Sequence, residues 1–389
     1  MPAVEVLEWQ PWVQDFNRRH GDIEIQMVEG PAFTDQLESL YTTAYLLGHS
    51  PYDIMNIDVS WLPKFAAAGW LLDLGDRLPA GEAQAFLAPD WAGGTFQGHI
   101  YRLPSYTGVG LLYYRQDLLT AAGYDPPQTF AELLSQSQAL QSQGKVKWGY
   151  LWQGKQYEGL AAMFVEVLAG FGGYWVDPQT LAVGLDAPQA IAAVDFLKET
   201  LATGVSPPGV TTYAEEDTRY LFQSGQALFL RNWPYVYTLA SQPDSPIRHK
   251  FGLQGMVHAP QHSSGACQGG WGFGISSQSA HPEAAWTVLQ YLTSETVQKE
   301  FALATGKIPA RKSLFQDADI LARFPYYSQI YGLLEQATLR PPITQYAQAS
   351  DILQRYLSAA LTGQLGTRKA LERAARETRQ LLDVPLSPS

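Results

Sequence analysis

The first seventy residues alternate between segments with the periodicity of a strand and segments with the periodicity of a helix. Residues 23–28 (IEIQMV) alternate between apolar and polar side chains, which predicts a strand, and residues 53–57 (DIMNI) predict a second one. Apolar residues at helical spacing occupy 7–19, 33–47 and 61–70. Strands that alternate with helices are typical of a mostly parallel sheet with helices on its faces, so the predicted fold class is α/β.

A short stretch at 227–235 (ALFLRNWPY) joins a predicted strand to several large side chains. Its first four residues are apolar, which is typical of a strand covered on both faces. Pro234 cannot donate to a sheet ladder and disfavours a helical conformation at Trp233. We therefore expect Arg231, Trp233 and Tyr235 to emerge where the strand ends, which is where ligands bind in open α/β folds. The same pattern also fits two core aromatics that cap the sheet.

Composition bounds the size of the fold and the kinds of partner. At 389 residues the chain is long enough for two domains, each with its own core. A net charge of −11 without a basic stripe argues against nucleic acid. Cys267 is the only cysteine, so an intrachain disulfide is impossible, and no run of residues approaches the roughly 20 apolar residues of a membrane span. The 11 Trp and 21 Tyr suit sugar rings, and they suit a large core equally well.

Catalytic and metal-binding motifs give no supported site. His258 and His262 have the HxxxH spacing of zinc proteases, but Pro260 lies between them and breaks the helix that this spacing requires. The phosphate-binding, dinucleotide-binding and nucleophile-elbow glycine motifs do not occur in the sequence. Nothing in the sequence sets two carboxylates at the separation of a glycosidase pair. We therefore predict no catalytic residue, no metal and no cofactor, and we expect binding.

Glycine-rich stretches mark two places where the chain can cross between lobes. Residues 105–110 (SYTGVG) precede a predicted strand, and residues 269–276 (GGWGFGIS) follow a Pro/Gly/Ser-rich run. Glycines permit backbone conformations and close approaches that other residues resist.

Several runs, in one order along nearly the whole chain, carry a resemblance to a known family. They are 148–159 (WGYLWQGKQYEG), 231–235 (RNWPY), 269–271 (GGW), Arg340-Pro341 with Tyr346, 58–61 (DVSW) and 111–115 (LLYYR). With these runs the chain resembles the extracellular solute-binding proteins of carbohydrate ABC importers, and within that family it is most similar to trehalose- and maltose-binding proteins.

The resemblance implies a two-lobe, type II periplasmic-binding-protein-like fold in which each lobe is a mostly parallel sheet flanked by helices. Residues 1–108 and 272–312 would form the first lobe, 109–271 and 313–389 the second, joined by a multi-strand hinge. The implied ligand is a glucose-containing disaccharide or glucoside, such as trehalose, maltose, sucrose or glucosylglycerol, held by clamshell closure. The implied protein is a monomer that is not an enzyme, works with membrane permease subunits, and is periplasmic or associated with the cell envelope.

The resemblance also implies which residues contact the sugar. The first-lobe contacts would be Asp58 and Tyr106, together with Glu5 near the start of the first helix. The hinge and second-lobe contacts would be Tyr157, Glu158, Trp233, Tyr235, Gly270, Trp271 and Arg340.

Three features depart from the family pattern. Gly108 stands where an acidic sugar-binding residue is expected, and Glu38 stands where a basic one is expected, so the identity of the sugar stays open. The family's first strand should precede Val4, where almost no chain is left for it, and an export signal is not present in this chain. Two other functions also stay open: a glycoside hydrolase or transferase that acts on disaccharides, and a scaffold or lectin-like interaction module.

Overall fold

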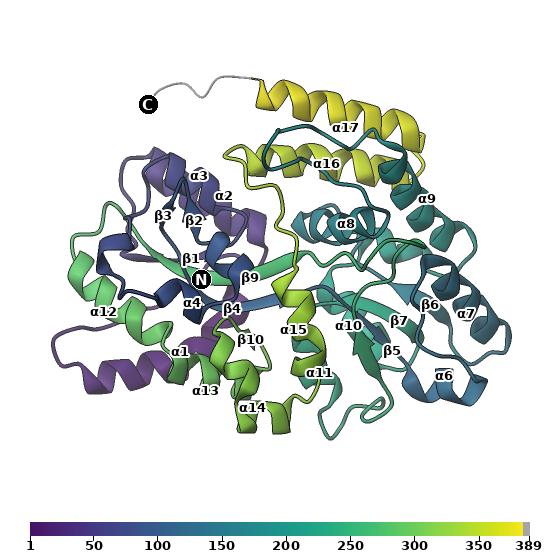
Figure 1. The fold of residues 1–389 in the computed structure, drawn as a ribbon, viewed down its shortest axis with the longest axis horizontal. Coiled ribbons are helices and arrows are strands. Elements are labelled where there is room, and N and C mark those ends of the chain that lie inside the picture. Colours follow the sequence, from purple (N-terminus) through teal and green to yellow (C-terminus); the bar gives the residue numbers. More distant parts are fainter. Residues whose placement is uncertain (384–389) are drawn as a thin grey trace.

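The computed structural model describes residues 1–383, apart from the side chain of Val4, as two lobes that are each built on a four-stranded sheet (Figure 1). The first sheet has the strand order β1-β9-β4-β10, formed by Ile54–Asp58, Gln268–Ile275, Leu103–Val109 and Ile308–Pro309. The second has the order β6-β7-β5-β8, formed by Trp148–Leu151, Ala227–Asn232, Leu111–Tyr114 and Gly252–Gln254. A small hairpin pairs β2 (Thr95–Phe96) with β3 (His99–Ile100). The expected two-lobe α/β fold is confirmed.

Helices cover both sheets (Figure 1). Around the first sheet lie α1 (Ala3–Arg19), α2 (Thr34–Leu46), α3 (Leu62–Ala67), α4 (Glu82–Ala85), α5 (Ala88–Ala92), α12 (Pro282–Leu292) and α13 (Glu295–Thr305). Around the second lie α6 (Gln116–Ala122), α7 (Phe130–Ser142), α8 (Glu158–Gly170), α9 (Pro188–Ala202), α10 (Glu215–Gln223), α11 (Tyr235–Ala240), α16 (Tyr346–Leu361) and α17 (Thr367–Leu382). Helices α14 (Ala318–Arg323) and α15 (Tyr327–Glu335) lie between the lobes, and 3-10 turns occur at Gly75–Arg77, Pro208–Thr212 and Lys312–Gln316.

The chain crosses from the first sheet to the second at Gly110. This residue alone separates β4 from β5, and the two strands belong to different sheets. The chain returns between β8 and β9, over residues 255–267, which directly precede the glycine-rich stretch 269–276 where the second crossing is expected; that stretch itself lies largely within β9. The end assigned to the second lobe at residue 389 lies outside the described residues.

The expected direction of the strands is wrong. Among the strand pairs of the described chain, only β6 and β7 run parallel, and the other pairs are antiparallel. The cause lies in the crossings: β9 enters the first sheet from the second lobe and inserts between β1 and β4, so it runs against both.

The local predictions fare differently from one another. The strand predicted at 227–230 is β7. In the structure Thr129 caps α7 in a reciprocal capping box with Glu132. The strand predicted at 23–28 does not form, because these residues take part in no sheet ladder. Alternation of side chains specifies an extended segment, but a strand also needs a neighbour to pair with.

Gly110→Ala should destabilise the protein strongly, because an added Cβ would overlap Oε1 of Glu166, a fully buried carboxylate in an ion pair with Arg231. Overpacking and disturbance of a buried ion pair together predict a loss of at least about 3 kcal/mol. As a control, Gly332→Ala in α15 meets no described atom within 4 Å and should stabilise its helix by about 0.5–1 kcal/mol. Urea unfolding measures both changes, and equal stabilities for the two variants would contradict this account.

Candidate ligand-binding site

Three charged residues from separate parts of the chain meet between the lobes. Asp58 ends β1 of the first lobe, Glu158 begins α8 of the second, and Arg340 lies in the segment before α16. Nη2 of Arg340 is 2.7 Å from Oδ1 of Asp58, and its Nη1 is 2.7 Å from Oε1 of Glu158. All three side chains are buried. A planar guanidinium with several donors can bind one carboxylate on each side, so Arg340 joins the two lobes in one ion-pair network.

Hydroxyl groups complete the hydrogen bonding of both carboxylates. The hydroxyl and the backbone N–H of Ser60 donate to Asp58 over 2.7 and 2.9 Å. Tyr346 donates to Oε1 of Glu158, and Ser350 donates to its Oε2 over 2.6 Å. Ser60 and Ser350 were missed from the sequence, as was a site role for Tyr346. The available signal was the spacing of Tyr346 and Ser350, which places them on one face of a helix.

The low-dielectric surroundings shift the ionisation of this network. Burial raises the pKa of Glu158 above its ordinary value, although Arg340 acts in the opposite direction. Burial alone would lower the pKa of Arg340, but the charges of Asp58 and Glu158 reverse this and raise it. Burial and the neighbouring Glu158 raise the pKa of Tyr346, so its hydroxyl stays protonated and can donate.

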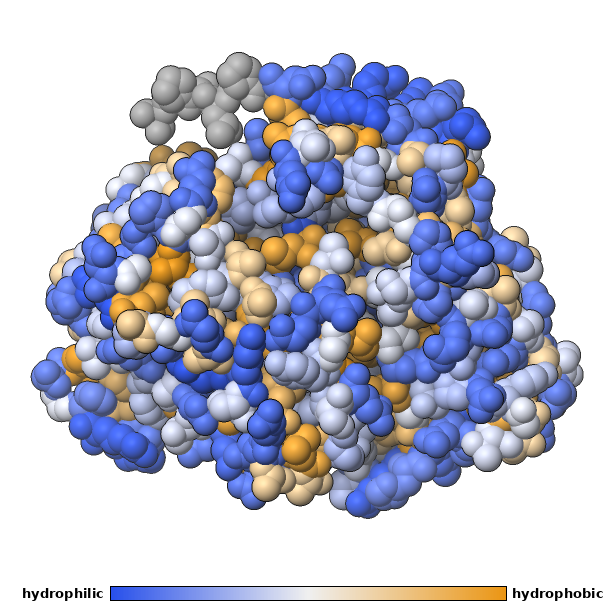
Figure 2. All heavy atoms as spheres, in the orientation of Figure 1, coloured by the Kyte–Doolittle hydropathy of each residue, from blue (hydrophilic) through white to orange (hydrophobic). Residues whose placement is uncertain are grey.

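Two half-buried indoles lie along strand β9 of the hinge. Trp271 is the cross-strand partner of both Asp58 on β1 and Tyr106 on β4. The ring of Trp233 packs against Gly269, where an added Cβ would come within 2.9 Å of it. Trp271 thus belongs to β9, Trp233 packs against it, and both indoles remain partly exposed. Figure 2 shows a hollow on the displayed face between the first lobe and helices α16 and α17.

Gly270 sits at a position that only glycine fits. Its φ is 143°, in a region that side chains of L-residues rarely adopt. Its carbonyl accepts the N–H of Val59 over 3.1 Å, and an added Cβ would lie 3.0 Å from the carbonyl oxygen of Tyr106. The residue therefore lets β9 approach β4 closely beside Trp271.

A second contact between the lobes involves Tyr157. Its hydroxyl donates to Oε2 of Glu215 over 2.6 Å, and Nε1 of Trp233 lies 3.4 Å from the other oxygen of the same carboxylate. Phe33 of the first lobe packs edge-on against the Tyr157 ring with centroids 6.1 Å apart. The ammonium of Lys155 lies 4.1 Å from the centroid of Phe33. Tyr157 thus links Trp233 to the opposite lobe.

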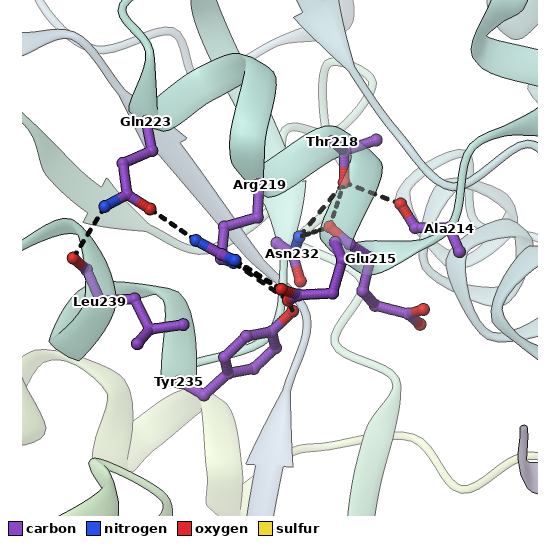
Figure 3. A network of polar contacts seen from close by, with 9 residues as sticks. Ala214, Glu215, Thr218, Arg219, Gln223, Asn232, Tyr235 and Leu239 are labelled. Atoms are coloured by element: carbon purple, nitrogen blue, oxygen red, sulfur yellow. Dashed lines mark hydrogen bonds and ion pairs between the residues drawn. The ribbon is translucent and has the colours of Figure 1, made fainter. Parts of the chain in front are cut away.

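Tyr235 is tied into a network at the start of α10 (Figure 3). Its hydroxyl donates to Oε1 of Glu216 over 2.7 Å, and Arg219 binds the same carboxylate. The amide of Asn232 donates to Thr218 over 3.2 Å, which fastens the end of β7 to this helix. Burial and the nearby Glu216 raise the pKa of Tyr235. The hydroxyl of Tyr235 therefore already has a protein partner.

Arg231 does not emerge at the end of the strand, so that expectation is wrong. Its side chain is fully buried and forms two bonds to Glu166 of 2.7 and 2.5 Å. Side chains alternate along β7, and at this position they face the interior, where only a paired charge is tolerated. The guanidinium carbon lies 4.3 Å from the ring centroid of Trp233, so Arg231 packs against the face of that indole.

Glu5 and Tyr106 form a second polar cluster with Lys307. The hydroxyl of Tyr106 donates to Oε1 of Glu5, and the ammonium of Lys307 lies 2.9 Å from the same atom. Lys307 also bonds Glu8 over 2.6 Å, and the amide of Asn56 lies 3.4 Å from Oε2 of Glu5. Burial and the adjacent Glu5 raise the pKa of Tyr106. No local pattern in the sequence signals Lys307.

The two residues that depart from the family pattern occupy different surroundings. Gly108 pairs with Gly269 across β4 and β9, and an added Cβ would make only an ordinary contact with Pro234 at 3.5 Å. Glu38 is buried on α2 and pairs with Lys64 over 2.5 Å. The position of Gly108 therefore has room for a side chain, whereas Glu38 is held in an ion pair with Lys64.

No group of three or more His, Cys, Asp and Glu side chains within residues 1–383 could hold a metal ion. Nδ1 of His258 lies 2.9 Å from the carbonyl oxygen of Ala259. Cys267 is buried, and burial raises its pKa to about 12, so it is a poor thiolate.

Asp90 of α5 is a buried carboxyl group that sequence reasoning missed. Its side chain is 1% exposed, and no hydrogen-bond partner for Oδ1 is found in the described chain. An added Cβ at Gly270 would lie 3.3 Å from this oxygen, which places Asp90 directly behind the hinge. Burial raises the pKa of Asp90 to about 7.

These features define a class of protein: two α/β lobes that are joined by crossing strands and meet at buried charges and half-buried aromatic rings. The model of the family described as bacterial extracellular solute-binding protein matches residues 4–299, and the chain belongs to that family. The resemblance drawn from the sequence is thereby confirmed at the level of the family. Among the residues described here, none of the helices combines the length and the apolar character needed to cross a membrane.

Named relatives and solved structures agree with this assignment. The chain is 32% identical over 346 residues to a probable ABC transporter-binding protein of Deinococcus radiodurans, covering 87% of this chain and 82% of the relative. It is 25% identical over 331 residues to the maltotriose-binding protein of Pyrococcus abyssi, covering 82% and 67%. The structure is similar to that of maltose-bound MalE3 of T. maritima, with a TM-score of 0.92, 35% identity and 98% of both chains covered.

Arg340→Ala should shift the protein toward an open form, because it leaves Asp58 and Glu158 buried without their cation. Removing one partner of a buried ion pair costs about 3–5 kcal/mol, and separating the lobes lets water solvate both carboxylates. We expect a larger radius of gyration in small-angle X-ray scattering. As a control, Arg379→Ala removes a half-exposed ion pair with Asp186 and should scatter like the parent protein. Identical scattering from both variants would disprove the bridging role.

Asp90 predicts a specific dependence of stability on pH. A carboxyl group whose pKa is raised in the folded state binds its proton more tightly there than in the unfolded chain. Its contribution is fully present below about pH 4 and is lost as the pH rises to about 7, by up to ~4 kcal/mol. Asp90→Asn removes this ionisation, so the variant should gain stability relative to the parent between pH 4 and 8.

Urea unfolding at several pH values measures this gain. The exposed Asp244→Asn serves as the control and should show no such trend. A stability difference for Asp90→Asn that stays constant over this range would show that Asp90 does not titrate there.

Proposed function

We propose that this protein is the sugar-binding subunit of an ABC importer and captures a glucose-containing disaccharide or glucoside by closure of its two lobes. The observation that carries the proposal is the convergence of Asp58 and Glu158, from opposite lobes, on Arg340 beside the half-buried Trp233 and Trp271. The similarity to maltose-bound MalE3 and to a maltotriose-binding protein supports the choice of sugar class. Trehalose, maltose, sucrose and glucosylglycerol are all candidates, since each offers a glucose ring.

The two kinds of side chain would act on different parts of the sugar. Stacking a pyranose on Trp233 or Trp271 removes on the order of 100 Å² of apolar surface from water, which contributes roughly 2–3 kcal/mol. Asp58 and Glu158 can accept hydrogen bonds from hydroxyls, while Nε of Arg340 is a buried donor that has no partner among the described residues. A sugar that lacks the matching hydroxyl leaves such a group unpaired, which gives selectivity.

Closure follows from contacts that belong to both lobes. A sugar that touches Asp58 and Glu158 together is bound better by the closed form, and it shifts the equilibrium by that difference in affinity alone. We propose the sugar contacts Glu5, Asp58, Tyr106, Tyr157, Glu158, Trp233, Tyr235, Gly270, Trp271 and Arg340. Because the hydroxyls of Tyr106, Tyr157 and Tyr235 already bond to carboxylates, their rings and the shared carboxylates are the parts left to meet the sugar.

The remaining parts of the proposal concern the setting of this activity. We assign residues 1–108 and 272–312 to the first lobe, and 109–271 and 313–389 to the second. The protein would act as a monomer outside the cytoplasmic membrane, in the periplasm or associated with the cell envelope, and would deliver its sugar to permease subunits without chemical change. The family consists of extracellular solute-binding proteins, which supports the location outside the cytoplasmic membrane and the delivery of the sugar to permease subunits.

Titration with maltose in a calorimeter tests the proposal. The parent protein should bind one sugar, and Trp233→Ala should bind it about 30- to 150-fold more weakly, because a stacking surface worth 2–3 kcal/mol is lost. Circular dichroism should show that the variant remains folded. Tyr174→Ala removes a half-exposed ring outside the proposed site and should leave the affinity unchanged.

Three outcomes would contradict parts of the proposal. Unchanged affinity of Trp233→Ala would remove that residue from the site. Release of glucose from maltose or trehalose, detected by chromatography, would support a glycoside hydrolase or transferase instead. Absence of binding across a thermal-shift screen of small glycosides, with no compaction in scattering, would favour an interaction module.

A further inference from the structure

Two helices from opposite lobes begin with an aromatic residue at the position where a hydrogen-bonding cap is usual. Phe33 is the N-cap of α2 and Tyr157 is the N-cap of α8, and among the described residues neither makes a side-chain cap bond. Ser, Thr, Asp and Asn are preferred there, because their side chains accept backbone N–H groups that the first turn leaves unpaired. Proteins break such local rules at functional sites, so both residues need a role outside their own helices.

The two rings meet between the lobes. Phe33 and Tyr157 pack edge to face with centroids 6.1 Å apart, which is an arrangement that aromatic pairs prefer. Lys155, just before α8, places its ammonium 4.1 Å from the centroid of Phe33, within the range of a cation–π contact. Phe33 is half-buried and belongs to no hydrophobic core cluster of the described residues. The aromatic and the cationic partner of its ring therefore both come from the second lobe.

Tyr157 is fixed in the position that this contact requires. Its ring lies against Gly159, where an added Cβ would come within 2.2 Å of the phenol oxygen. Its hydroxyl donates to Oε2 of Glu215 over 2.6 Å, and Nε1 of Trp233 lies 3.4 Å from Oε1 of the same carboxylate. Since the ring of Trp233 packs against β9, the contacts form a series from the hinge strand through Tyr157 to Phe33 of the first lobe.

The lobes are thus connected on two sides of the start of α8. Glu158 joins the Arg340 bridge, and its carboxylate oxygens also bond residues of α16. The preceding residue, Tyr157, bonds α10 and meets Phe33. The charges of the bridge are buried, whereas the ring of Phe33 is partly exposed. A ligand that is too large therefore displaces the Phe33 contact at lower cost than the Arg340 bridge.

We propose that Phe33 and Lys155 form a latch that closes the α10 side of the sugar site and limits the ligand to two rings. The inference rests on the proposed function, because it concerns the size of sugar that the same site accepts. Trp233 belongs to the closed side, so a ring stacked on it is the last that fits there, and a second ring reaches Glu158 at the bridge. A third ring has to open the latch, which removes contacts that stabilise the closed form.

Phe33→Ser separates the latch from the stability of α2. Serine is a favourable N-cap, so the Tm of the ligand-free variant should equal or exceed that of the parent, although the ring is lost. Lys155→Met removes the ammonium and keeps an apolar side chain. Lys147→Met is the matched control, because the ammonium of Lys147 lies 5.2 Å from the ring centroid of Trp148 and both residues belong to the second lobe.

Calorimetry with maltose and with maltotriose measures the effect of the latch on selectivity. The parent should bind maltose about tenfold more tightly than maltotriose, since only the longer sugar breaks the two contacts of Phe33. Phe33→Ser should abolish most of this difference, because it removes both contacts. Lys155→Met removes the cation contact alone and should reduce the difference about threefold. Lys147→Met should keep the ratio of the parent.

Each remaining outcome overturns the proposal. If maltose binds but the parent binds maltotriose equally well, or if both latch variants keep the ratio of the parent, the latch is refuted and the proposed function stands. Binding of neither sugar by the parent would refute both. An equal loss of selectivity with Lys147→Met would show that the position of the cation does not matter. A Tm of Phe33→Ser several degrees below that of the parent would assign the ring to the stability of the first lobe.

Discussion

A single guanidinium held by carboxylates from two lobes is the interaction on which the closed arrangement depends. Burying charges costs free energy, and a buried ion pair offsets that cost only when its hydrogen bonds are complete. Here Ser60, Tyr346 and Ser350 satisfy the oxygens around Arg340. Because Asp58 and Glu158 lie on different lobes, opening exchanges at least one of the two Arg340 ion pairs for contacts with water. The free energies of the open and the closed form then differ by the balance of large opposing contributions. A few contacts from a sugar are therefore sufficient to change which form is favoured.

A second buried pair has the opposite role, because both its members lie in one lobe. Arg231 and Glu166 are fully enclosed, and opening the lobes does not separate them. The guanidinium packs 4.3 Å from the ring of Trp233, while Asn232 accepts the backbone N–H of that residue over 2.8 Å. The indole is thus held by groups of its own lobe. A ring positioned before the sugar arrives loses little conformational entropy on binding, which leaves more of the stacking energy as affinity.

What the sequence predicted correctly was local or came from the family resemblance. Strand β7 depends on neighbours in the chain, so an apolar run reveals it. The resemblance selected Asp58, Glu158 and Arg340, which do meet, although 282 residues separate the first from the last. The antiparallel sheets, the burial of Arg231 and the roles of Lys307 and Asp90 depend on partners distant in sequence. No spacing rule reveals such partners, and for the same reason alternation at 23–28 could not guarantee a strand.

The absence of the strand predicted at 23–28 has a physical consequence in the first lobe. Strand β1 carries Asp58 at its end and is paired along one edge, where Asp58 lies opposite Trp271. Its other edge faces a cavity, so nothing in the described chain pairs with that side of the strand. A side chain on a strand paired on one edge is less restrained than one on a central strand, and a shift of about 1 Å is enough to weaken a positioned hydrogen bond. The half of the site that Asp58 and Glu5 provide is therefore less restrained than the half built on β7, because β7 is paired on both edges, with β6 and with β5.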